Sequence, residues 1–258
     1  MPVKLNYQML GEGEPVMILH GLFGSISNWN PIAKKLADCF QIISVDLRNH
    51  GDSEHAGNMT YPDMVEDIRG LMDSLDLSGI NLIGHSMGGK VAMGFALTYP
   101  DITSKLIVVD VAPVSYEPTF HDYIAAMQTM PVANIKNRNE AEQYLADTIP
   151  ESMIRQFLLQ NLVRKENGFA WRINLAAIGN DLETIAGFPE NWPNSRYTGP
   201  TCFLAGERSD YIEPEHVQII SRLFPEALLH IIEQAGHWVH AENPAEATDR
   251  IRAFLQNK

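Results

Sequence analysis

A serine lies at a predicted sharp turn between a strand and a helix, within residues 84–88 (GHSMG). Residues 81–83 before it are an apolar run typical of a buried strand, and residues 87–99 after it have the apolar spacing of a helix. Such a turn strains the backbone of the serine, so the residues two positions before and after it must be small. Both are glycine. The segment therefore predicts that Ser86 presents its hydroxyl above the carboxyl end of a sheet.

The rest of the chain alternates between short apolar runs and helical patterns. Strands alternating with helices indicate right-handed βαβ crossovers, and near-continuous Ile, Leu and Val indicate a sheet covered on both faces. We therefore predict an α/β fold with a mostly parallel, doubly wound sheet. Residues 4–10 alternate instead, which favours an antiparallel edge strand. The other predicted strands are 16–19, 41–45, 81–83, 105–109, 201–205 and 228–232, and the helices are 29–36, 61–77, 87–99, 213–224 and 244–255.

Residues 113–198 interrupt this alternation. They contain helical patterns at 140–146 and 151–163 but no convincing buried strand. We predict an α/β core of residues 1–112 and 199–258, with residues 113–198 inserted as a helical cap. Aromatic residues of the cap either face a cleft or pack the cap on the core, and packing is the commoner role for any single one. They are Tyr116, Phe120, Tyr123, Phe157, Phe169, Trp171, Phe188 and Trp192.

A histidine is needed near the serine, because a serine hydroxyl becomes a good nucleophile only when a positioned base accepts its proton. His237 follows the last predicted strand and precedes a helix start at Asn243 and Pro244. This order places His237 on a loop at the carboxyl end of the sheet. His240 is the nearest competitor, and we expect it to be a surface or packing residue.

Two aspartates are candidates for the carboxylate that orients this histidine. Asp110 ends the predicted strand that follows the serine helix, and Asp210 follows the next predicted strand. Both strand ends lie on the same rim of the sheet, so either carboxylate can reach the histidine. Position along the chain does not decide between them.

The loop after the first buried strand, residues 20–24 (HGLFG), is the second place where an oxyanion donor is expected. Its glycines allow the backbone to approach a substrate closely. We predict that the backbone N–H groups of Leu22 and Met87 together hold a developing oxyanion. A strand-end His-Gly is also a common turn, so this motif carries less weight than the serine turn.

Five segments taken in order resemble the α/β-hydrolase superfamily, and more closely the YbfF type of bacterial esterase and its eukaryotic abhydrolase relatives. They are residues 20–24 (HGLFG), 46–53 (DLRNHGDS), 84–90 (GHSMGGK), 109–114 (VDVAPV) and 236–240 (GHWVH). The resemblance spans nearly the whole chain. It implies the α/β-hydrolase fold and a serine nucleophile.

The resemblance also bears on two open questions. In that group the acid lies in an Asp-x-Ala-Pro setting, which matches Asp110, so the resemblance favours Asp110 as the acid. The additional aspartate Asp210 departs from the pattern of the group and keeps the alternative open. Asp46, Arg48 and His50 invite a substrate-binding role. Related hydrolases use this loop mainly as an internally hydrogen-bonded brace, and we expect the same here.

Composition restricts the partners of the chain. A formal net charge of −13 and a pI near 5.0, with only 19 Lys and Arg, argue against a nucleic-acid surface. The first ten residues do not read as a signal peptide, and no apolar run reaches the roughly 18 residues of a membrane span. We expect a cytoplasmic protein without stable membrane association, a monomer or homodimer, with Cys39 and Cys202 reduced, buried and free of metal.

The predicted function is that of a serine carboxylesterase acting on small to medium acyl or aryl esters through an acyl-enzyme. No metal and no organic cofactor are required. Epoxide hydrolases and haloalkane dehalogenases are disfavoured, because they need an aspartate where Ser86 stands. A thioesterase or C–C bond hydrolase on the same triad remains an alternative, as does a peracid-forming side reaction. A ligand receptor with slow turnover is the alternative from another class.

Overall fold

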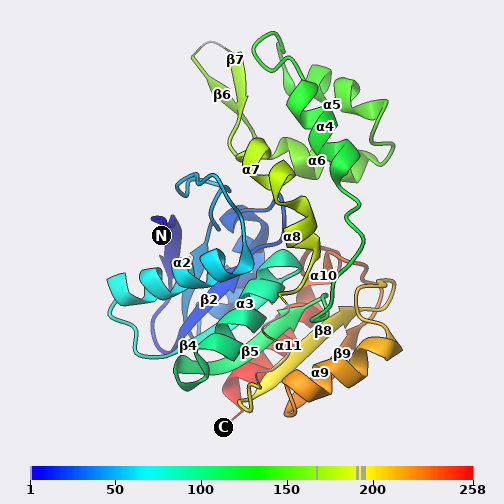
Figure 1. The fold of residues 1–258 in the computed structure, drawn as a ribbon. Coiled ribbons are helices and arrows are strands. Elements are labelled where there is room, and N and C mark those ends of the chain that lie inside the picture. Colours follow the sequence, from blue (N-terminus) through cyan, green and yellow to red (C-terminus); the bar gives the residue numbers. More distant parts are fainter. Residues whose placement is uncertain (1, 167, 190–191, 193–195, 258) are drawn as a thin grey trace.

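Seven strands form one sheet in the order β1-β3-β2-β4-β5-β8-β9, in a computed structural model that describes residues 2–166, 168–189, 192 and 196–257 (Figure 1). β1 pairs with β3 antiparallel and every other pair in this sheet is parallel, so the predicted doubly wound α/β fold with an antiparallel first strand is confirmed. The strands are β1 (Tyr7–Leu10), β2 (Pro15–Leu19), β3 (Gln41–Val45), β4 (Ile80–His85), β5 (Thr103–Val109), β8 (Thr201–Gly206) and β9 (Ala227–Ile232).

The order of the strands places a topological switch point at β2. The chain passes from β2 to β3 on one side and then returns to β4 on the other. Ligands of open α/β sheets bind outside the carboxyl ends of strands at such a point. The loops that follow β2 and β4 begin there, and they carry Leu22 and Ser86.

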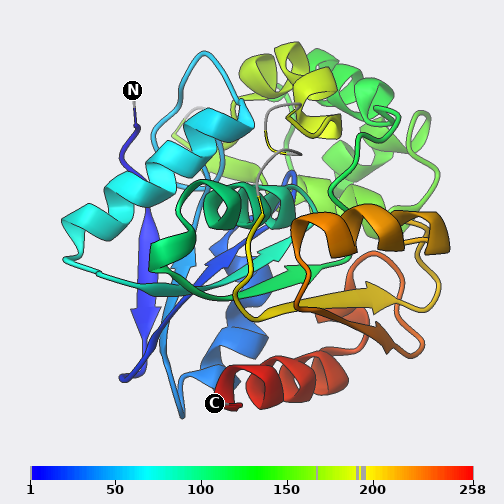
Figure 2. The ribbon, with the colours of Figure 1, turned by 60° about the horizontal axis from the view of Figure 1, so that its bottom comes forward.

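Helices cover both faces of this sheet (Figure 2). Alternation along β2 explains why: Val16 and Ile18 belong to one hydrophobic core, and Met17 and Leu19 to the other. No helix in the described part of the chain is both long and apolar enough to span a membrane. The face of Met17 and Leu19 carries α2 (Tyr61–Ser74), α3 (Met87–Thr98) and α9 (Val217–Leu223), and the face of Val16 and Ile18 carries α1 (Asn30–Leu36) and α11 (Pro244–Gln256). Short helices are η1 (Ile26–Trp29), η2 (Pro100–Ile102), η4 (Pro214–His216) and α10 (Val239–Glu242).

A helical insertion between β5 and β8 lies over one end of the core (Figure 1), and we refer to it as the cap. It also contains a two-stranded hairpin, which the sequence did not predict. The helix expected over 151–163 ends at Leu159, because Leu162 and the residues after it pair with the second hairpin strand. The cap consists of α4 (His121–Thr129), α5 (Arg138–Ala146), α6 (Ser152–Leu159), β6 (Leu162–Lys165), β7 (Gly168–Trp171), α7 (Leu175–Asn180) and α8 (Leu182–Ala186).

Two predictions of burial are wrong. β9 was expected to be buried, but Leu228 is 53% exposed and Ile231 is 51% exposed. Within the part of the chain that the structure describes, β9 is an edge strand that pairs with β8 alone, so its side chains have fewer neighbours than those of an equally apolar central strand. Cys202 is buried in β8, whereas Cys39, in the turn after α1, is exposed.

Candidate active site

Ser86 occupies the turn between β4 and α3 with φ 53° and ψ −120°, a conformation that is strained for a residue with a side chain. The glycines around it are sterically required. A Cβ on Gly84 would lie 2.2 Å from the carbonyl oxygen of Gly88, and one on Gly88 would lie 2.5 Å from that of Leu19. The predicted strand–serine–helix turn is therefore present, with its serine at the carboxyl end of β4.

Three side chains from separate strand ends form a hydrogen-bonded row. His237 Nε2 lies 3.0 Å from Ser86 Oγ, and His237 Nδ1 lies 2.8 Å from Asp110 Oδ2. Asp110 is completely buried, and its Oδ1 accepts a hydrogen bond of 2.9 Å from the backbone N–H of Gly206. A carboxylate acceptor at Nδ1 places the proton there and leaves Nε2 free to accept the serine proton.

Of the two candidate aspartates, Asp110 is the one that contacts His237. Asp210 is exposed, and the residues on either side of it reach the site instead. Ser209 donates a hydrogen bond to Asp110 Oδ2, and the ring of Tyr211 stacks on His237 with centroids 3.9 Å apart. Sequence reasoning found neither Ser209 nor Tyr211, because only the path of the loop after β8 brings them to the histidine.

The loop after β2 lies directly against the serine turn. β2 and β4 are neighbours, and a Cβ on Gly21 would lie 3.3 Å from the Cβ of Ser86. A backbone hydrogen bond of 3.0 Å from Gly24 to Gly21 closes the loop. Leu22, between them, and Met87, the first residue of α3, both line a cavity that also reaches Ser86.

Asp46, Arg48 and His50 point into the protein, as expected of a brace. Arg48 forms a buried ion pair with Asp67, with Nε 2.6 Å from Oδ2. Asp46 Oδ1 accepts a hydrogen bond of 2.8 Å from the backbone of Ile26. His50 Nε2 accepts one of 3.1 Å from Phe23. Asp46, Arg48 and His50 line neither of the two cavities at Ser86.

Buried histidines surround the site, and burial lowers the pKa of each. The pKa of His50 and of His240 falls to about 3, and the pKa values of His20 and His85 also lie below the ordinary value. These rings are therefore neutral at physiological pH. His240 stacks on Trp29 with centroids 4.7 Å apart, which is the packing role expected of it.

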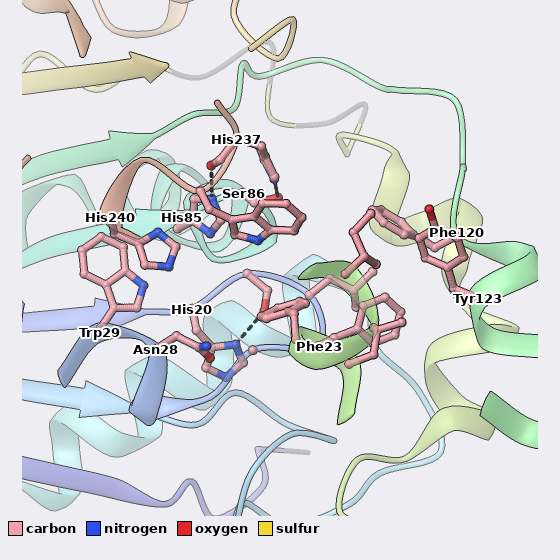
Figure 3. Close-up of a pocket in the computed structure, with 17 residues that line it drawn as sticks. His20, Phe23, Asn28, Trp29, His85, Ser86, Phe120, Tyr123, His237 and His240 are labelled. Carbon is pink, nitrogen blue, oxygen red and sulfur yellow. Dashed lines mark hydrogen bonds between the residues drawn. The ribbon is translucent and has the colours of Figure 1, made fainter. Parts of the chain in front are cut away.

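Two cavities meet at Ser86 and share Leu22 and Phe120 in their walls. The larger, of about 60 Å³, contains His237 in its wall, and Figure 3 shows Ser86 and His237 across it from Phe120 and Tyr123. The smaller, of about 50 Å³, lies on the α3 side of the serine. Four of the predicted cap aromatics line one or both cavities, namely Tyr116, Phe120, Tyr123 and Phe157. Four line neither cavity, namely Phe169, Trp171, Phe188 and Trp192.

Lys90 is a buried lysine in the wall of the smaller cavity and was not predicted. Its Nζ donates hydrogen bonds of 2.7 Å to the carbonyl of Ala186 and 2.6 Å to that of Gly187, at the C-terminal end of α8. The ammonium also lies 4.7 Å from the centre of the Tyr116 ring. Burial lowers the pKa of Lys90 to about 7. The side chain thus joins α3, the helix that follows Ser86, to α8 of the cap.

One group in the described part of the chain has the residue types and spacing of a metal site. The ligand atoms of Glu213, Glu215 and His216 lie within 4.8 Å of one another before α9. These side chains are exposed or half-buried, and none of them lines a cavity at Ser86. The group is therefore separate from the serine site.

Comparisons with known proteins agree with the observed fold. A family model described as the alpha/beta hydrolase fold matches residues 14–244. The sn-1-specific diacylglycerol lipase ABHD11 of Mus musculus is 41% identical over 98% of this chain and 86% of its own length. Esterase YbfF of Escherichia coli is 35% identical over 95% of this chain and 94% of its own. The solved structure of a marine microorganism esterase matches with a TM-score of 0.93 and 40% identity, over 98% of this chain and all of that one. The chain therefore belongs to the α/β-hydrolase fold family, among relatives that include esterases and a lipase.

Proposed function

We propose that the protein is a serine carboxylesterase that works through an acyl-enzyme. The observation that carries this proposal is the row Ser86–His237–Asp110, with distances of 3.0 and 2.8 Å, at the meeting point of two cavities. The named esterase and lipase relatives support an ester as the substrate.

In the proposed reaction His237 accepts the hydroxyl proton of Ser86 as Oγ attacks the ester carbonyl. The backbone N–H groups of Leu22 and Met87 stabilise the oxyanion that develops. His237 then passes the proton to the departing alcohol, which leaves an acyl group on Ser86. Water repeats these steps and releases the acid.

The two cavities can hold the alcohol and acyl groups of an ester, one in each cavity. The alcohol receives its proton from His237, so it leaves on the side of the larger cavity, whose wall contains that histidine. The acyl group then occupies the smaller cavity beside α3. The wall of the larger cavity includes the aromatic rings of Phe120, Tyr123, Phe157 and Trp238. Such a lining favours uncharged substrates of small to medium size, including aryl esters.

The proposed setting is the cytoplasm, where free thiols such as Cys39 stay reduced. The proposed state is a monomer or homodimer with small-molecule esters as its ligands and without a metal or cofactor. Size-exclusion chromatography with light scattering measures that state, and a larger assembly would contradict it.

The test is an ester-hydrolysis assay over p-nitrophenyl esters of increasing acyl length. Ser86→Ala should reduce the rate to background, and Asp110→Asn should reduce kcat by about a thousand-fold or more. Asp210→Asn is the matched control and should retain wild-type activity. An active Ser86→Ala variant would reject the mechanism, and inactive Asp210→Asn beside active Asp110→Asn would reject the acid. A clear preference for thioesters of the same acyl groups, or the absence of turnover on every ester, would reject the carboxylesterase function.

A further inference from the structure

We propose that Asn161 of the cap is a positioning residue, which holds the carbonyl of Phe23 and thereby completes the oxyanion hole only while the cap is seated on the core. The inference rests on the proposed function, because it assigns a cause to the position of the Leu22 N–H group.

We refer to residues 20–24, the loop after β2, as the oxyanion loop. Phe23 is the residue of this loop whose backbone needs support from other parts of the protein. Its φ is 61°, in the left-handed region that a residue with a bulky side chain seldom adopts. If Phe23 relaxed to a negative φ, the loop would turn at that point. The Leu22 backbone, one residue earlier, would move with it. The position of the proposed oxyanion donor therefore depends on what restrains Phe23.

The core restrains the amide of Phe23. Its N–H donates to His50 Nε2 at 3.1 Å, while His50 Nδ1 lies 3.0 Å from the carbonyl oxygen of Arg48. A carbonyl only accepts, so the proton of His50 is on Nδ1 and Nε2 is free to accept from Phe23. The low pKa of His50, about 3, keeps this arrangement at any pH near neutrality.

The cap restrains the carbonyl of the same residue. Asn161 Nδ2 donates to the oxygen of Phe23 at 2.7 Å, across 138 residues of sequence. Asn161 is 2% exposed and Phe23 is 3% exposed, so this bond is shielded from water. The ring of Phe23 also meets Phe120 edge-on, with centroids 5.8 Å apart. Phe23 is thus held from the core on its N–H side and from the cap on its C=O side.

Asn161 is itself firmly placed within the cap. It lies between α6 and β6, where its N–H donates to the carbonyl of Leu158 at 3.1 Å and its carbonyl accepts from Arg172 at 2.8 Å. A displacement of the cap would therefore carry the carboxamide away from Phe23. Through this bond, the seating of the cap sets the geometry of the oxyanion loop.

The neighbouring residue offers a matched control. Gln160 also joins the cap to the segment after β2, because its Oε1 accepts a hydrogen bond of 3.0 Å from Asn28 Nδ2. That contact is exposed and joins two side chains, so it does not restrain the backbone of the oxyanion loop. Gln160→Ala removes a link between cap and core without touching Phe23.

The experiment compares Asn161→Asp, Asn161→Ala and Gln160→Ala with wild type, using kcat, KM and the affinity for a pair of ketone inhibitors. A trifluoromethyl ketone adds to Ser86 and forms an oxyanion, whereas the methyl ketone of the same chain binds without reacting. Both Asn161 variants should lose about ten- to a hundred-fold in kcat and in trifluoromethyl ketone affinity. KM and methyl ketone affinity should stay near wild type. Gln160→Ala should match wild type in all four quantities.

Two results would overturn the proposal. One is an unchanged kcat in a folded Asn161 variant. The other is a lower kcat together with a higher KM and weaker binding of both ketones, which would mean that the cap has collapsed. If Asn161→Asp does not fold, Asn161→Ala decides, since it removes the donor without placing a carboxylate against the Phe23 carbonyl. A wild type inert toward all esters, or an active Ser86→Ala variant, would instead reject the proposed function and this inference with it.

Discussion

The imidazole of His237 lies almost flat against the phenol ring of Tyr211, with centroids 3.9 Å apart and planes inclined by 21°. Tyr211 comes from the loop after β8, so this loop contributes a ring to the histidine as well as the Ser209 hydroxyl to Asp110. Stacking of this kind is worth about 0.5–1.5 kcal/mol beyond burial. We infer that it orients the imidazole between Ser86 and Asp110.

Removal of this ring should slow the reaction. Tyr211→Ala should reduce kcat on a short acetyl ester by about ten-fold, because His237 loses one face of its support. Tyr211→Phe retains a ring in the same place and should recover most of that rate. Equal losses in the two variants would show that the phenol hydroxyl, rather than stacking, is what matters.

The buried pair of Arg48 and Asp67 should be a large term in stability. Both side chains are at most 1% exposed, and burial raises the pKa of Asp67 although hydrogen bonds from Arg48 lower it. Arg48→Met should reduce the free energy of unfolding in urea by about 3–5 kcal/mol, because it leaves a buried carboxylate without its partner. Arg48→Met combined with Asp67→Leu should recover a large part of that loss. An Arg48→Met variant as stable as wild type would contradict this explanation.

Lys90 should make the free energy of unfolding depend on pH above neutrality. Its pKa is about 7 in the folded protein against 10.5 ordinarily, so between these values the unfolded chain binds more protons than the folded one. The free energy of unfolding should therefore rise with pH across this window, by at most about 1.4 kcal/mol per pH unit, and the gain should be lost as pH falls to 7. Urea unfolding of wild type and Lys90→Met from pH 7 to 10 isolates this slope. A difference between them that does not vary with pH would contradict it.

The features that could be predicted from sequence are those set by local pattern. The serine turn was recognisable because Gly84 and Gly88 flank Ser86 between a strand run and a helix pattern, and these residues lie within a few positions of one another. The same holds for the start of α11, where Asn243 Oδ1 accepts from the N–H of Glu246 as its capping role predicts.

The features that escaped prediction depend on residues distant in sequence. The choice of Asp110 over Asp210 requires the direction of two side chains relative to a histidine 127 residues from Asp110. Lys90 reads as an ordinary helix residue until α8 is placed beside it. The hairpin β6–β7 was missed because pairing between its strands overrides the helical pattern that precedes it.

The most direct test of the central claim is covalent labelling of Ser86. A fluorophosphonate should add one phosphonyl group per chain, and peptide mass spectrometry should locate it on Ser86. Labelling should be abolished in Ser86→Ala, strongly slowed in Asp110→Asn and unchanged in Asp210→Asn. Label on another residue, or equal labelling rates in wild type and Asp110→Asn, would contradict the proposed Ser86–His237–Asp110 mechanism.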